Sequence, residues 1–147
     1  MKRALAGVGL VAALVFAAVA MGAIKHYHGT VDQGGTVSFQ TKVRHHKAKR
    51  VKNFFFYKVT LTCEGGATIP ISNRKPLKFP IPPMKVRHRR FHGSFSNSDF
   101  KTSGEVHGKF TDHYRKAKGT LRVHGRPLGA MQGKCDTGTD DWTAKKQ

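Results

Sequence analysis

Apolar and polar residues alternate along several segments of the chain beyond its first 25 residues, and this alternation constrains the fold more than any other feature. Val37, Phe39 and Val43 alternate with polar neighbours, as do Leu121 and Val123. A period of two places successive side chains on opposite faces of a β-strand. The segments after the N-terminal run lack the periodicity of an amphipathic helix. The sequence therefore predicts an all-β fold.

The segment 54–63 is the most aromatic of these predicted strands. Its pattern allows two faces, and we assign Phe55, Tyr57, Val59 and Leu61 to the buried one. Bulk adds Trp142 to the expected core. The full set of residues expected to face the core is Phe55, Tyr57, Val59, Leu61, Phe95, Phe110, Leu121, Val123 and Trp142.

Short strands separated by turn signals are typical of an antiparallel β-sandwich, with an up-and-down β-barrel as the alternative. The turn signals are Gln33–Gly35, Glu64–Gly66, Asn97–Asp99 and Lys118–Gly119. The segment Ile69–Val86 differs, because it holds five of the six prolines. Proline removes a donor from the strand ladder, so this segment is expected to be an edge strand or an extended connection. Leu77, Phe79, Ile81 and Met84 are expected to hold it against the core.

The N-terminus has the pattern of an export signal. Lys2 and Arg3 precede a run without charged residues from Ala4 to Ile24. Residues 1–20 are interpreted as a helical signal peptide and 21–147 as a single β domain. The alternative is an uncleaved membrane anchor over 4–24, because 21 residues at about 1.5 Å each span a bilayer core of about 30 Å. Both interpretations place the domain outside the cytoplasm, secreted or anchored.

The chain contains two cysteines, Cys63 and Cys135. In an exported protein an even cysteine count predicts a disulfide. The bridge would close a loop of about 70 residues, which the chain-entropy model values at about 4 kcal/mol.

Charge is the strongest functional signal, with a formal net charge of +19. The segment Lys42–Lys52 carries six cations and no acid, and we expect it to be an exposed hairpin loop. A second cluster surrounds His88. We predict that both clusters bind an anionic polymer of the cell surface, because each phosphate or sulfate contact releases condensed counterions. The predicted binding residues are Lys42, Arg44, Lys47, Lys49, Arg50, Lys52, Lys85, Arg87, Arg89 and Arg90.

Other partners are less well supported by the sequence. The cations are not interleaved with aromatic residues, and no nucleic-acid-binding signature is present, so no specific nucleic acid is expected. A membrane becomes a partner only if the signal is uncleaved. A charged face that only keeps the protein soluble is the competing interpretation.

An apolar-His-Gly-x-apolar pattern recurs along the chain. It occurs at Tyr27–Val31, Phe91–Phe95 and Val106–Phe110, and its first half recurs at Val123–Gly125. In a strand this pattern places the histidine outside and the glycine inside, where a ring can approach closely. The histidines lack acids or cysteines at metal-ligand spacing, so neither a metal nor another cofactor is expected.

Several of these runs resemble small exported bacterial β-rich proteins of unassigned function. The similarity lies in Phe91–Phe95, Gly108–Phe110, Gly119–Val123 and Cys135–Ala144, and it covers most of the chain after the signal. The resemblance implies export, an all-β fold and a Cys63–Cys135 bridge. It brings no catalytic residues.

The acids give no pattern typical of catalysis, because most lie in turn signals and none forms an arrangement that spacing can reveal. No catalytic residue is therefore assigned. We expect an exported basic protein, non-enzymatic, that binds an anionic surface polymer or another extracellular partner. The alternatives are a structural or stress-related exported protein without a specific ligand, and an enzyme acting on carbohydrate or nucleic acid.

We predict that the exported chain begins near Met21, because Ala18 and Ala20 provide the small residues that signal peptidase recognises. N-terminal sequencing of secreted protein measures this directly. A chain that keeps residue 1 and remains in the membrane fraction would support the anchor instead.

Overall fold

The computed structural model describes residues 22–74, 80–98, 101–126 and 133–147. These residues form antiparallel strands and one 3-10 turn, η1 (Asp112–Tyr114). The strands are β1 (Ala23–Val31), β2 (Thr36–Arg44), β3 (Lys47–Tyr57), β4 (Val59–Cys63), β5 (Thr68–Ile71), β6 (Met84–Lys85), β7 (Arg90–Asn97), β8 (Thr102–Thr111), β9 (Lys116–Gly125), β10 (Cys135–Asp136) and β11 (Asp140–Lys146). The predicted all-β antiparallel fold is confirmed. The predicted signal helix lies outside the described residues. None of the described residues belongs to a helix of the length and apolarity needed to cross a bilayer.

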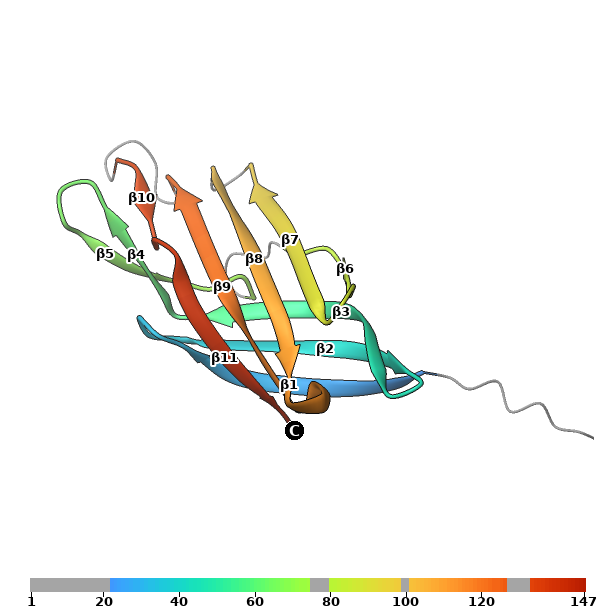
Figure 1. The fold of residues 1–147 in the computed structure, drawn as a ribbon. Helices are drawn as coiled ribbons and strands as arrows, with labels where there is room; N and C mark the ends of the chain where they lie inside the picture. The colour runs from blue at the N-terminus through green and yellow to red at the C-terminus, as the bar shows by residue number, and fades with distance from the viewer. Residues whose placement is uncertain (1–21, 75–79, 99–100, 127–132) are drawn as a thin grey trace, which may run out of the picture.

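The eleven strands of the described residues belong to one continuous sheet. The path runs β5-β4-β10-β9-β11-β1-β2-β3-β6, and β9 pairs with β8 along its other edge, which in turn pairs with β7. Figure 1 shows β1, β2 and β3 crossing the direction of β7, β8 and β9 at a steep angle. β11 joins the two groups because it pairs with both β9 and β1. The sheet therefore folds over on itself and encloses a core.

The core is built from aromatic rings contributed by both groups of strands. Phe39 on β2 stacks on Tyr27 with ring centroids 4.8 Å apart. Phe39 also contacts Phe91 on β7, Phe110 on β8 and Trp142 on β11, at centroid distances of 5.8, 6.3 and 5.9 Å. Such pairs add about 0.5–1.5 kcal/mol each beyond the area that they bury. The aromatic contacts thus hold the two groups of strands together.

Glycines on the inner face make room for these rings, as the repeated pattern predicts. Phe91 lies directly opposite Gly108 on the neighbouring strand, and a Cβ at Gly108 would lie 2.1 Å from the Phe91 ring. Gly119 lies opposite Gly108 in turn. The prediction of a turn at Lys118–Gly119 is wrong, because Gly119 lies inside β9, where a Cβ would come within 1.8 Å of the His107 carbonyl oxygen.

Seven of the nine residues expected in the core are buried: Val59, Leu61, Phe95, Phe110, Leu121, Val123 and Trp142. The assignment of faces at the end of β3 is wrong. Phe54 and Phe56 are buried, Phe55 is half-buried and Tyr57 is 49% exposed. Lys58 adopts a left-handed φ of 54° between β3 and β4, which interrupts the alternation. The buried positions just before Lys58 are therefore even and those just after it are odd.

The proline-rich segment begins at the edge of the sheet, as predicted. β5 contains Pro70 and pairs only with β4 among the described strands. Ile81 and Met84 are buried, while Leu77 and Phe79 lie outside the described residues. The buried side chain of Asn73 extends the ladder of β3, because its Oδ1 accepts a hydrogen bond of 2.7 Å from the Phe56 amide.

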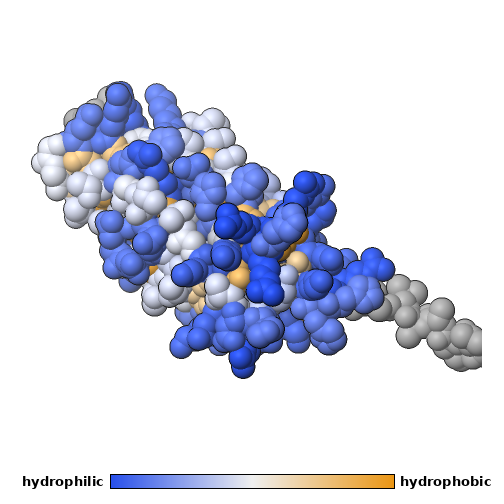
Figure 2. All heavy atoms as spheres, viewed as in Figure 1, coloured by the Kyte–Doolittle hydropathy of each residue, from blue (hydrophilic) through white to orange (hydrophobic). Residues whose placement is uncertain are grey.

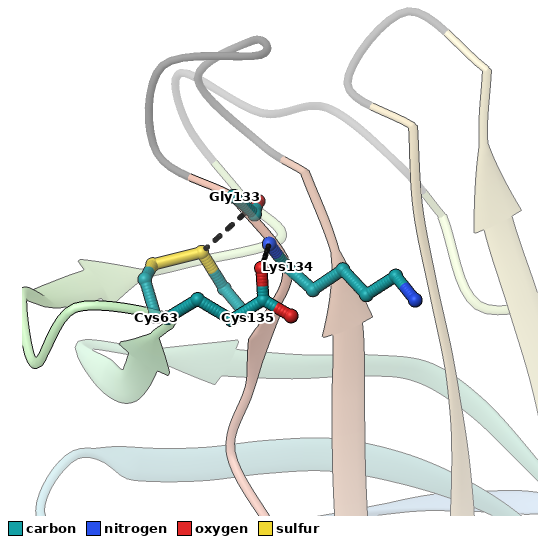
Figure 3. The surroundings of a disulfide bond; sticks show 5 residues. Cys63, Gly133, Lys134 and Cys135 are labelled. Carbon is teal, nitrogen blue, oxygen red and sulfur yellow. Dashed lines mark hydrogen bonds between the residues drawn. A yellow bond between two sulfur atoms is a disulfide. The ribbon is translucent and has the colours of Figure 1, made fainter.

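The predicted disulfide between Cys63 and Cys135 is confirmed. The two cysteines are direct partners in the short pairing of β4 with β10 (Figure 3). The Lys134 amide beside the bridge donates a hydrogen bond of 3.2 Å to Oε2 of Glu64, and the Glu64 amide donates one of 2.8 Å to the Lys134 carbonyl. Because β10 has only two residues, the bridge ties the β4–β5 hairpin to the rest of the sheet. A buried structural disulfide indicates an oxidising environment.

Replacing both Cys63 and Cys135 by Ser should lower the free energy of unfolding by about 2–5 kcal/mol, because the unfolded chain loses the closure of a long loop. Urea unfolding of the variant and of wild type measures the difference. Wild type with a reductant provides a matched control and should fall to the stability of the variant. Equal midpoints for oxidised wild type and the variant would contradict a structural role.

Candidate functional site

Two tight hairpins position the predicted binding residues. His45 and His46 form the loop between β2 and β3, and His88 and Arg89 form the loop before β7. All four have positive φ, from 48° to 65°, as both loop residues of a type I′ turn require. Lys42–Lys52 is an exposed hairpin, as expected, but its cations lie on the two strands and not in a loop, because the turn between the strands has only two residues.

Strand β6 brings the two basic clusters together. Lys85 on β6 is the direct partner of Arg50 on β3, and Arg50 is the direct partner of Lys42 on β2. All ten predicted binding residues are exposed. We call them the basic corner: Lys42, Arg44, Lys47, Lys49, Arg50, Lys52, Lys85, Arg87, Arg89 and Arg90.

Two hollows in the basic corner are lined, among the described residues, without any acidic side chain. The larger has a volume of about 490 Å³. Its lining consists of Lys42, Arg44, Lys49, Arg50, Lys52, Lys85, Val86 and Arg87. The smaller, of about 320 Å³, lies around Lys47, Lys49, His88 and Arg89. An anionic group in either hollow would meet several cations at once.

Cations lie directly opposite one another in the basic corner. The opposed pairs are Lys42 with Arg50, Arg44 with Lys47, Arg50 with Lys85, and Arg87 with Arg90. Like charges directly opposite across a ladder destabilise a sheet by a few tenths to about 1 kcal/mol per pair. The site is therefore built at some expense of stability.

Among the described residues, the aspartates that form ion pairs do so with cations outside the basic corner. Asp112 pairs with Arg115 at 2.6 Å, and Asp136 pairs with Arg122 at 2.7 Å. In each case the hydrogen bond from the arginine lowers the pKa of the carboxyl group. These ion pairs leave the charge of the basic corner uncompensated.

A larger hollow of about 970 Å³ lies on the outer face of β7, β8, β9 and β11. Its lining includes Arg90 of the basic corner together with Lys109 and Lys118. The binding residues predicted from the sequence include neither Lys109 nor Lys118, although Lys118 belongs to a third basic run with Arg115 and Lys116, because both lie far along the chain from Arg90. Only the pairing of β7 with β8 and of β8 with β9 brings Arg90, Lys109 and Lys118 together.

The histidines of the repeated pattern point outward, as predicted. His92 and His107 stack with ring centroids 6.0 Å apart. His124 instead forms a hydrogen bond of 3.0 Å with Ser103. Across the described ranges, no three His, Cys, Asp or Glu side chains gather in an arrangement that could hold a metal ion.

Asp140 is the one buried acid of the described residues and lies on the core side of β11 with Trp142. Neither oxygen of its carboxyl group has a hydrogen-bond partner within the described part of the chain. Burial raises the pKa of this carboxyl, and the nearby charges of Asp32 and Asp141 raise it further. A carboxyl group enclosed in the core has no access to a substrate, so this shift does not indicate catalysis.

Comparison with known proteins adds no further assignment: no protein-family model, curated protein or solved structure matches the chain.

Replacing Asp140 by Asn should stabilise the protein at neutral pH by about 1 kcal/mol, the usual scale of a single buried change. A carboxyl whose pKa is raised by folding stabilises the protein below its unfolded value of 3.8 and loses that contribution as the pH rises through the folded pKa. The advantage of the Asp140→Asn variant should therefore grow as the pH rises from acid to neutral.

Urea unfolding at several pH values measures this advantage. Glu105→Gln is the control, because Glu105 is exposed and is not among the charges that raise the pKa of Asp140, so its replacement should change stability by less than about 0.5 kcal/mol. An Asp140→Asn variant with the same pH dependence as wild type would contradict the role of this carboxyl.

Proposed function

We propose that this protein is an exported, non-enzymatic binder of anionic polymer and that the basic corner is its binding surface. The observation that carries the proposal is the set of cations placed directly opposite one another, without ion-pair partners among the described residues. Local rules of stability tend to be broken where function requires it. A bound polyanion would supply the missing negative charge.

A role in solubility alone accounts less well for this arrangement. Solubility depends on net charge, which cations spread over the whole surface would supply equally. The basic corner instead concentrates ten cations on two hairpins and one short strand. Concentration of one sign of charge in a hollow raises the local density of counterions and of anionic ligands.

Exported location supports the choice of a cell-surface polymer. The N-terminal residues 1–20 have the pattern of a signal peptide, and the Cys63–Cys135 disulfide is typical of proteins in oxidising compartments. We also interpret the folded-over sheet as a variant of the antiparallel sandwich, because its two groups of strands face each other across the aromatic core. In this interpretation the rigid sheet holds the cations in fixed rows.

Replacing Arg44, Lys47, Lys49 and Arg50 by Gln should weaken the salt dependence of binding. The slope of log K, where K is the binding constant, against log salt concentration should become about three units less steep, since each lost phosphate contact removes about 0.7–0.9 units of slope. Stability should stay the same or rise slightly, because like-charged partners are removed. A salt titration on heparin, teichoic acid and DNA measures the slope, and thermal unfolding measures stability.

The matched control removes four exposed cations that lie in connections between strands outside the basic corner, by replacing Lys58, Lys101, Arg126 and Lys134 with Gln. This variant has the same net charge as the first and should keep most of the wild-type slope. Equal slopes for the two variants would show that binding follows net charge alone and would overturn the proposal.

A further inference from the structure

A row of cations continues from the basic corner across the outer face of the sheet. Arg90 on β7 is the direct partner of Lys109 on β8, and Lys109 is the direct partner of Lys118 on β9. All three side chains are exposed and line the hollow of about 970 Å³. We call these three residues the outer row.

Lys85 and Arg87 connect the outer row to the hairpin cations. Both residues line the hollow of the outer face and also the hollow of about 490 Å³ beside β2 and β3. Arg87 is also the direct backbone partner of Arg90. The cations thus form one series across six neighbouring segments of chain: Lys42, Arg50, Lys85, Arg87, Arg90, Lys109 and Lys118.

The path from Lys42 to Lys118 through these residues is about 30 Å long, since neighbouring strands lie about 4.8 Å apart and residues two apart on a strand about 6.7 Å. It does not lie in one plane. β3 and β7 belong to the two crossing groups of strands, and β6 lies between them at the corner (Figure 1). Figure 2 shows hydrophilic side chains spread over this view of the molecule, with only small apolar spots between them.

We propose that the whole series is one curved track for a flexible linear polyanion, such as a chain of phosphate groups, and that the outer row is its second half. This inference rests on the proposed function and adds the class of ligand. A flexible chain can bend around β6 and contact both halves. Duplex DNA, with a persistence length of about 150 base pairs, stays straight over this distance and contacts one half.

The surroundings of the outer row determine where the track ends. The next partner beyond Lys118 is Thr143 on β11, and the far side of the hollow is lined by Asp32 and Asp141. Their negative charge repels a polyanion. The chain would therefore leave the surface after Lys118 rather than continue across β11.

The first test replaces Arg90, Lys109 and Lys118 by Gln and titrates binding of long-chain inorganic polyphosphate against salt. The slope of log K against log salt concentration should become about two units less steep, because three contacts are lost and each contact with a flexible single chain contributes about 0.7. If binding at 1 M salt is unchanged, the same slope predicts about a hundredfold weaker binding at 0.1 M. Lys101, Arg126 and Lys134 replaced by Gln form the control, which should keep most of the wild-type slope.

The second test compares single-stranded and duplex DNA of equal length on wild type. Dividing each slope by about 0.7 for the single strand and about 0.9 for the duplex gives the number of phosphate contacts. We expect roughly twice as many contacts with the single strand. The outer-row variant should lose contacts with the single strand, and thermal unfolding should show that it remains folded.

The outcomes separate this inference from the proposed function. If the variant of Arg44, Lys47, Lys49 and Arg50 loses binding while the outer-row variant loses no more than the single contact of Arg90, about 0.7 units of slope, the continuous track is wrong and the proposed function stands. Equal contact numbers for single strand and duplex would also overturn the track. If neither variant differs from its matched control, both proposals fail.

Discussion

The packing of aromatic rings against glycines on the inner face of the sheet is the constraint on which the rest of the structure depends. Phe91 lies over Gly108, where a methyl group would overlap its ring, and Gly119 lies so close to the next strand that a side chain has no room. These gaps let Phe39 reach rings from the crossing group of strands. Without that close approach the sheet could not fold over on itself.

The folded-over sheet in turn produces the basic corner. Because β1–β3 and β7–β9 cross, the short strand β6 lies between them, where it pairs with β3 and leads directly into the hairpin of β7. Cations that belong to separate segments of sequence become direct partners there. The long-range packing of the core therefore determines the spacing of charges on the surface, and the cost of opposing like charges is offset by the stability of the core.

Much of the local structure could be predicted from the sequence. The alternation of residues predicted the strands, and the repeated pattern predicted outward histidines and inward glycines, because a strand places successive side chains on opposite faces. The same argument failed at Phe55 and Tyr57, since the left-handed Lys58 interrupts the alternation in a way that no composition reveals. It failed again at Gly119, where a glycine that signals a turn serves close packing between strands.

The sequence by itself determined the excess of positive charge, the cysteine pair and the grouping of ten cations into two clusters, because each depends on composition or on neighbours along the chain. Only the tertiary structure decided which cations face one another. The link between Arg50 and Lys85, and the row through Lys109 and Lys118, arise from strand pairing across long stretches of chain. Register between distant strands depends on how the whole core packs, which local periodicity does not contain.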